Sequence, residues 1–159
     1  MALSKAKKSM LNQVFVKACS FCSYQERTQQ EVRDKLYKQD IDKDLIEEII
    51  VRLIEENFIN EERFARTFAG GKFRVKRWGK NKIRQALKEK GVSPYCIKKG
   101  IEEIDEEDYT TTMHYLIEKK DKGIKEKNLF KKKNKISNYL IGKGYEPELV
   151  WDVLNSAIN

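Results

Sequence analysis

The run from Phe73 to Gly91, FRVKRWGKNKIRQALKEKG, is the part of this sequence whose residue types point most directly to chemistry. It holds eight Lys or Arg residues and one acid, Glu89. Clustered ammonium and guanidinium groups attract anions such as phosphates and carboxylates. Counting Lys and Arg against Asp and Glu, segments 72–91 and 119–143 each carry +8, whereas 28–71 carries −4 and 92–118 carries −5. This alternation favours a surface that binds a nucleic acid or an acidic protein over an evenly solvated one.

Three cysteines and the single histidine form the other candidate for chemistry. Cys19, Cys22, Cys96 and His114 would together make a Cys3His zinc set. In zinc sites a CxxC pair normally lies on a turn, whereas CSFC lies within a helical apolar stripe. We therefore expect buried thiols that pack as small apolar side chains, and no bound metal.

Residue combinations typical of catalysis do not occur in the chain. No Ser or Cys has an evident histidine partner, and there is no glycine-rich loop of the nucleotide-binding kinds. The acids from Asp105 to Asp108 fit the first turn of a helix better than a metal site. A nuclease is disfavoured because the basic run lacks clustered carboxylates for metal ions. We expect no enzymatic activity and no cofactor.

Hydropathy and cysteine use indicate where the protein works. No uncharged apolar run approaches the ~18 residues that a membrane helix needs, and the apolar piece LNQVFV is interrupted at Lys17 without a cleavage pattern. Three cysteines without an export signal indicate reduced thiols. We expect a cytoplasmic monomer that does not bind membranes.

One spacing of apolar residues occurs three times along the chain. The intervals within each copy are 4, 5, 5, 4 and 3 residues, and successive copies are offset by 51 and 53 residues. The three sets are Val32, Leu36, Ile41, Ile46, Ile50, Leu53; Ile83, Leu87, Val92, Ile97, Ile101, Ile104; and Ile136, Leu140, Tyr145, Val150, Leu154, Ala157. Such a period predicts tandem repeats of one small unit.

Each copy has the pattern of a helix, a turn and a helix, preceded by a further helix. Thr28, Asp42 and Asn60 stand where helix N-caps are expected. Gly91 and Gly144 can end helices in the left-handed conformation, and Ser93-Pro94 and Glu146-Pro147 can begin the next ones. With two prolines and eight glycines, the chain has little turn punctuation for a β fold. We predict an all-α, elongated array of three three-helix repeats, at 1–57, 58–105 and 106–159.

The stretch ERFARTFAGGKFRVKRWGKNKIRQALKEKGV, 62–92, resembles the RecX family, bacterial regulators of the RecA recombinase. Two further segments resemble the family: RTQQEVRDKL, 27–36, and IEENFINEERFA, 54–65. The matching positions of the central motif are Glu62, Arg63, Phe64, Ala65, Gly79, Lys82, Ile83, Leu87, Lys90, Gly91 and Val92. Gly70-Gly71 departs from the family pattern, where larger residues continue a helix.

The resemblance implies a non-enzymatic protein that lies in the groove of the RecA–DNA filament. It would restrain ATP hydrolysis, strand exchange and coprotease activity in recombination and the SOS response. The competing hypothesis is a helical DNA- or RNA-binding protein that acts without RecA.

The basic run supplies the expected contacts to RecA or to single- or double-stranded DNA. They are Lys72, Arg74, Lys76, Arg77, Trp78, Lys80, Lys82 and Arg84. Trp78 could be a stacking anchor or a core residue at a helix junction. Secondary contacts are expected at Arg63, Arg66, Lys131, Lys132, Lys133 and Lys135, although the last four could equally form a solvated face.

Overall fold

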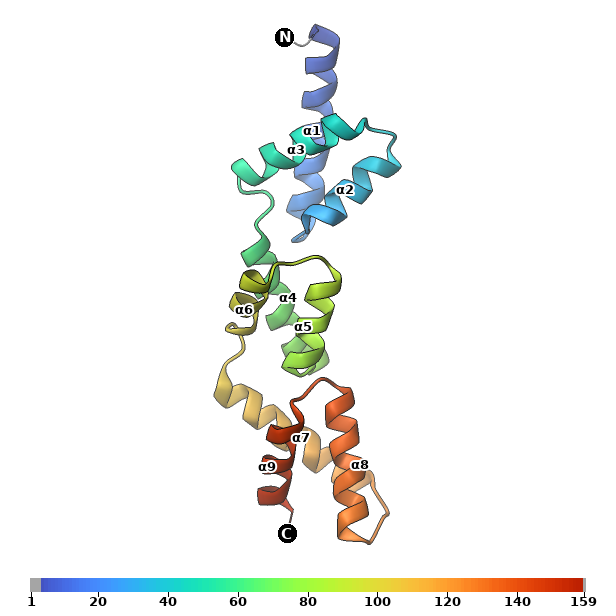
Figure 1. Ribbon diagram of the computed structural model, residues 1–159, viewed down its shortest axis with the longest axis vertical. Helices are drawn as coiled ribbons and strands as arrows, with labels where there is room; N and C mark the ends of the chain where they lie inside the picture. Colours follow the sequence, from blue (N-terminus) through green and yellow to red (C-terminus); the bar gives the residue numbers. More distant parts are fainter. Residues whose placement is uncertain (1–3, 159) are drawn as a thin grey trace.

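The computed structural model describes residues 4–158, and this part of the chain forms nine α-helices and no strand. The helices follow one another as three bundles along one long axis, with the chain ends at opposite tips (Figure 1). Their bounds are α1 Lys5–Tyr24, α2 Gln29–Lys38, α3 Lys43–Glu55, α4 Glu61–Lys76, α5 Lys80–Glu89, α6 Pro94–Ile101, α7 Glu106–Gly123, α8 Leu129–Gly142 and α9 Pro147–Ala157. The predicted all-α repeat fold is confirmed. Residues 1–3 of the first predicted repeat and residue 159 of the third lie outside the described residues.

Local sequence signals set most of these helix ends. Thr28 Oγ1 accepts a hydrogen bond from the Glu31 amide at 3.0 Å, and Asn60 Oδ1 accepts one from the Arg63 amide at 2.9 Å. Such bonds satisfy backbone donors that the first helical turn leaves unpaired. Asp42 also stands at an N-cap, but its side chain makes no capping bond. Gly91 takes a left-handed φ of +79° after α5, as its position predicted.

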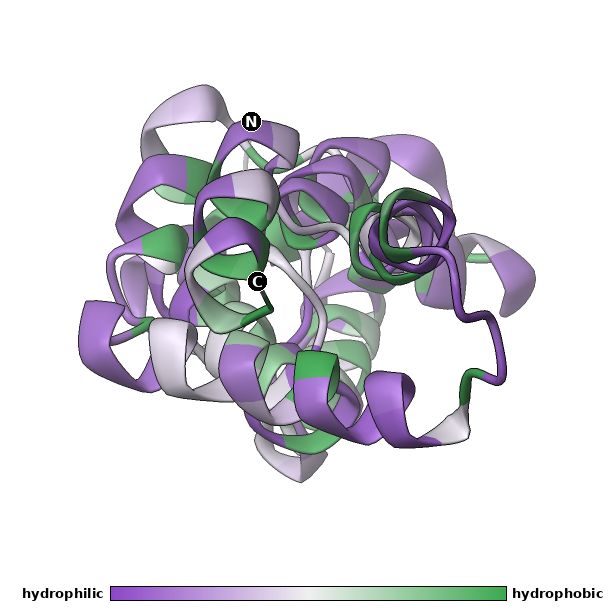
Figure 2. Ribbon diagram, turned by 90° about the horizontal axis from the view of Figure 1, so that it is seen from below, coloured by the Kyte–Doolittle hydropathy of each residue, from purple (hydrophilic) through white to green (hydrophobic). Residues whose placement is uncertain are grey.

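The apolar repeat forms the inner face of each bundle. Seen along the long axis, hydrophobic positions face the interior and hydrophilic ones face outward (Figure 2). Most repeat positions are buried, including Val32, Ile83 and Ile136 at 0% exposure. Ala157, the last position of the third set, is exposed. Ile158, the next residue, packs against the core in its place.

The buried residues form two hydrophobic cores. One joins α1–α3 and includes Ile59, so the packing of the first repeat extends past the predicted limit at residue 57. The other runs without a break from Phe64 to Leu154 and is shared by the second and third repeats. The first repeat instead meets the second through polar contacts, chiefly the 2.5 Å ion pair of Arg63 Nε with Glu26.

Gly70 and Gly71 do not interrupt the second repeat, since α4 continues through both to Lys76. Gly70 is buried, and the nearest atoms that a side chain there would meet belong to the flexible Arg74 guanidinium, at 2.8 Å. A side chain at Gly71 would meet no atom within 4 Å. The pair therefore does not change the shape of this repeat.

The α4–α5 turn and the α8–α9 turn are joined backbone to backbone. The Gly79 amide donates to the Lys143 carbonyl and the Asn81 amide donates to the Gly144 carbonyl, both at 2.8 Å. A Cβ at Gly79 would lie 2.2 Å from the Gly144 carbonyl carbon, so only glycine permits this approach. The contact fixes the basic run of the second repeat against the third repeat.

Candidate functional site

A row of alternating lysines and aromatic rings runs along the second repeat and crosses into the third. Its rings are Phe68, Trp78 and Tyr139, which are all half-buried. Lys72 Nζ lies 5.5 Å from the Phe68 ring centroid and 4.9 Å from that of Trp78. We call this row the lysine–aromatic ladder; its members are Lys90, Phe68, Lys72, Trp78, Lys82, Lys143, Tyr139 and Lys120.

The ladder crosses between the repeats at Lys82 and Lys143. Lys82 Nζ lies 4.7 Å from the Trp78 centroid, and Lys143 Nζ lies 5.8 Å from that of Tyr139. Lys120 Nζ reaches the same tyrosine ring at 4.7 Å. An ammonium over a ring face is held by the ring quadrupole, so the rings keep these lysines in place without neutralising them.

Burial and the positive charge gathered at this crossing both lower the pKa of Lys143. Burial lowers the pKa of Lys143, and repulsion from Lys82, Arg77 and Lys119 lowers it further. Its ammonium donates to the Lys76 carbonyl at 3.3 Å. Bringing an anion to this point would relieve the repulsion between these cations.

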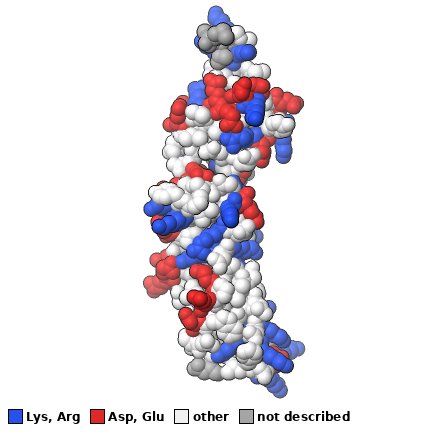
Figure 3. Space-filling view, viewed as in Figure 1, with Lys and Arg blue, Asp and Glu red and all other residues white. Residues whose placement is uncertain are grey.

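The ladder lysines are largely free of acidic partners. Within residues 4–158, only Lys90 has a carboxylate within 4.0 Å, that of Glu31 at 3.6 Å; Lys72, Lys82, Lys120 and Lys143 have none. On the face shown in Figure 3, positive side chains gather over the middle of the molecule and again at its lower end. The four unpaired ladder lysines are therefore available to an anionic partner.

Two buried tyrosines, Tyr109 and Tyr145, pack beside the crossing and bind its backbone by hydrogen bonds. The rings of Tyr109 and Tyr145 stack at 5.0 Å, and both side chains are fully buried. The Lys80 amide donates to the Tyr109 hydroxyl at 2.9 Å, and the Tyr145 hydroxyl donates to the Arg77 carbonyl at 3.0 Å. The Tyr109 hydroxyl in turn donates to Glu146. Burial raises the pKa of both tyrosines, so each stays neutral and retains its donor.

Five of the eight predicted contact residues lie at the ladder or beside it. Lys72, Trp78 and Lys82 are ladder members. The Arg77 guanidinium lies 4.8 Å from the Tyr115 ring centroid, and Lys76 is exposed next to it. Trp78 also packs against the shared core, which is one of the two roles that the sequence left open; its role as a stacking anchor stays a prediction.

Lys80 is a correction to the predicted set. It is 7% exposed, its ammonium pairs with Glu106, and it lies 4.5 Å from the Tyr109 ring centroid. The first turn of α5 directs this residue into the bundle together with Ile83 and Leu87. Lys80 therefore holds α5 against α7 and is not available to a partner.

The remaining predicted arginines lie away from the ladder. Arg74 folds back over Gly70, and Arg84 donates to Asn81 at 2.8 Å on another side of α5. Arg63 pairs with Glu26, as described above, and Arg66 pairs with Glu62 and, at 3.4 Å, with Glu103. These two arginines join elements of the protein to one another.

The lysine run of the third repeat is mostly held by neighbouring side chains. Lys132 pairs with Asp121, and Lys135 lies 3.8 Å from Glu126. Lys133 donates to Asn155 at 3.1 Å. Lys131 is exposed. These contacts favour the interpretation of this run as a solvated face.

Sequence reasoning missed five ladder members as site residues: Phe68, Lys90, Lys120, Tyr139 and Lys143. One signal was present, because Lys90 and Lys143 occupy equivalent positions in LKEKG and LIGKG, and each lies over an aromatic ring. The crossing itself depends on the approach of Gly79 to Gly144, which no local pattern encodes.

The four candidate zinc ligands belong to three different helices and do not form one cluster. Cys19 and Cys22 are in α1, Cys96 is in α6 and His114 is on an exposed part of α7. Burial raises the pKa of the Cys22 thiol to about 11. Residues 4–158 contain no group of three or more His, Cys, Asp or Glu side chains arranged to hold a metal ion. In the same range, no helix has the length and apolar character needed to cross a membrane.

Each of the three bundles matches a domain of a known protein family. Models of the first, second and third three-helix domains of RecX match residues 15–53, 60–101 and 106–154. The regulatory protein RecX of Bacillus cereus strain B4264 is 30% identical over 140 residues, which cover 88% of this chain and 52% of that protein. That of Clostridium botulinum strain Eklund 17B is 36% identical over 135 residues, 84% of this chain and 63% of that protein. The chain thus spans about half the length of the Bacillus relative.

Solved structures show the same arrangement. The crystal structure of RecX from Lactobacillus salivarius superimposes with a TM-score of 0.85 and 26% identity, covering 92% of this chain and 96% of that one. A second crystal structure, of regulatory protein RecX, gives a TM-score of 0.83 over 98% of this chain and 81% of that one. At 19% identity the second likeness concerns the fold alone.

Proposed function

This chain belongs to the RecX family of regulatory proteins, and on that premise we propose that it binds the RecA–DNA filament and restrains it. It would inhibit DNA-dependent ATP hydrolysis, strand exchange and coprotease activity through binding energy alone. The observation that carries the proposal is the lysine–aromatic ladder, a row of largely unpaired cations that crosses from one repeat to the next.

The shape of the site suits a long anionic partner better than a small one. The ladder extends from Phe68 of α4 to Tyr139 of α8, in two successive repeats of an elongated body (Figure 1), so it can contact successive phosphates or acidic side chains of a polymer. Each phosphate that a lysine neutralises releases a counterion, and binding should therefore weaken steeply as salt rises. Because Gly79 and Gly144 fix the two repeats together, the spacing of the cations is set before binding.

The half-buried rings add a second kind of contact. When phosphates draw the lysines away from Trp78 and Tyr139, the ring faces can stack on bases or pack on apolar side chains of the filament. Stacking of one base on an aromatic ring contributes roughly 1–3 kcal/mol. A protein seated in this way would occupy the filament surface that incoming DNA or the next subunit needs.

The same ladder also favours one alternative, binding to bare single-stranded nucleic acid without RecA. Alternating cations and aromatic rings are the usual means of sequence-independent single-strand binding. The two proposals differ in how much RecA strengthens the binding of this protein to DNA. The filament proposal requires much tighter binding to RecA–DNA than to DNA alone, whereas the alternative requires equal binding.

Inhibition of the DNA-dependent ATPase of the cognate RecA tests the filament proposal. The triple variant Lys72→Ala, Lys82→Ala, Lys143→Ala should need at least about tenfold more protein for half-inhibition, because three anion contacts are lost. A matched variant with Lys38→Ala, Lys125→Ala and Lys127→Ala removes three exposed lysines elsewhere and should inhibit as the unmodified protein does. Full inhibition by the ladder variant would place the site elsewhere.

A further inference from the structure

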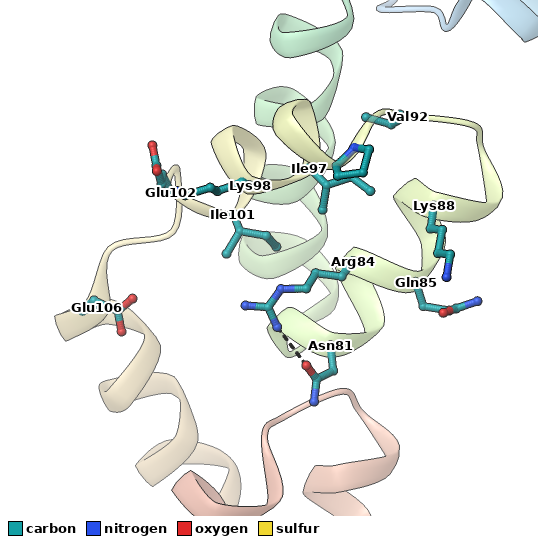
Figure 4. A pocket seen from close by; sticks show the side chains of 11 residues that line it. Asn81, Arg84, Gln85, Lys88, Val92, Ile97, Lys98, Ile101, Glu102 and Glu106 are labelled. Atoms are coloured by element: carbon teal, nitrogen blue, oxygen red, sulfur yellow. Dashed lines mark hydrogen bonds between the residues drawn. The ribbon is translucent and has the colours of Figure 1, made fainter.

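A second surface lies beside the ladder, on a different side of α5. It is a groove of about 840 Å³ between α5, α6 and the start of α7 (Figure 4). Lys82 extends from α5 to the ladder, whereas Arg84 and Lys88 of the same helix line the groove. The two surfaces share no residue.

The floor of the groove is aliphatic. Val92, Ile97 and Ile101 line it, and Ile97 remains partly exposed while the other two are buried. No aromatic ring is among the described lining residues, so the groove offers nothing on which a nucleobase could stack. An apolar side chain placed over this floor would remove aliphatic surface from water.

Three unpaired cations stand on the rim of the groove. Within residues 4–158, Arg84, Lys88 and Lys98 have no carboxylate within 4.0 Å. Two acids, Glu102 and Glu106, stand at the α7 end, but each already has a cation: Glu102 pairs with Lys99 at 3.7 Å, and Glu106 pairs with Lys80. The free charge around the apolar floor is therefore all of one sign.

We propose that this groove binds an acidic peptide segment that carries a large apolar side chain. The apolar side chain lies on the floor formed by Val92, Ile97 and Ile101, and the flanking carboxylates meet Arg84, Lys88 and Lys98. Both features are needed. A peptide with carboxylates alone would leave the aliphatic floor exposed to water, and a peptide with apolar side chains alone would leave the cations unpaired. The groove is thus a protein-docking site separate from the lysine–aromatic ladder. This proposal does not depend on the proposed filament function.

Fluorescence anisotropy with a synthetic peptide tests this proposal. The probe is a short fluorescein-labelled peptide of Asp and Glu with one Leu and one Phe. Two matched probes replace either both apolar residues by Ser or all acids by Asn and Gln. Each replacement is expected to weaken binding by about tenfold or more, the equivalent of roughly 1.4 kcal/mol.

Charge reversal on the rim locates the binding. The variant Lys88→Glu, Lys98→Glu should weaken binding of the intact probe at least about tenfold, while Lys125→Glu, Lys127→Glu should leave it within about twofold. All four positions are exposed, so the fold tolerates both variants. The ladder variant should bind the probe normally, which separates this proposal from the filament proposal.

Three results would overturn the assignment. They are equal binding of the probe that lacks apolar residues, unchanged binding by the Lys88 and Lys98 variant, and displacement of the peptide by a single-stranded oligonucleotide. The last result would make the groove a nucleic-acid site.

Discussion

At the scale of single residues, Gly79 and Gly144 allow two distant turns to touch. Gly144 has a φ of +105°, and a Cβ there would lie 2.3 Å from Lys82 Cβ and 2.6 Å from its backbone nitrogen. Gly71 is different in kind, because it is a helical residue with open space around it. These glycines therefore predict opposite effects of the same substitution.

Gly144→Ala should lower the free energy of unfolding by about 2–4 kcal/mol, since it adds both backbone strain and overlap with Lys82. Gly71→Ala should raise it by about 0.5–1 kcal/mol, because alanine is the better helix former and nothing is displaced. Urea unfolding of the two variants beside the parent measures both values. A Gly144→Ala variant as stable as the parent would mean that the two turns do not touch.

At the scale of elements, helix α5 presents side chains to three different parts of the molecule. Lys80, Ile83 and Leu87 face the shared core, Lys82 reaches the ladder, and Arg84 and Lys88 line the groove. The apolar spacing of this element and its end near Gly91 could be predicted from sequence, because burial of Ile83 and Leu87 follows a helical period. The inward direction of Lys80 could not, since it depends on Tyr109 and Glu106 of another repeat.

Two lysines of this helix should accordingly behave in opposite ways. Lys80→Ala should cost about 1–2 kcal/mol of stability, because the buried stem and its contact with Tyr109 are lost. Lys82→Ala should change stability by less than about 0.5 kcal/mol but should weaken binding to the filament. Thermal unfolding and ATPase inhibition by each variant separate the two roles. Equal stability losses would contradict the different placement of the two side chains.

At the scale of the whole molecule, three repeats of similar sequence form two cores of unequal size. Sequence periodicity predicts the three bundles and most of their buried positions. It does not predict that the second and third bundles merge, because the merging depends on Tyr109, Tyr145 and the glycine contact. The first bundle keeps a core of its own and meets the second through ion pairs at Arg63 and Lys90.

This division predicts two cooperative units in unfolding. Amides of α1–α3 should lose protection together at a lower urea concentration than those of α4–α9, because the smaller core buries less apolar surface. Hydrogen exchange followed by mass spectrometry at increasing urea resolves the two units. Simultaneous loss of protection along the whole chain would show that the polar junction couples the bundles as strongly as a shared core.

The central claim is that the ladder faces the RecA–DNA filament, and lysine footprinting on the assembled complex tests it most directly. Lys72, Lys82 and Lys143 should become protected from acetylation when the protein binds RecA filaments on single-stranded DNA. The exposed Lys38 and Lys125 should react as they do in the free protein. Unchanged reactivity of the three ladder lysines in protein that sediments with the filament would contradict the account.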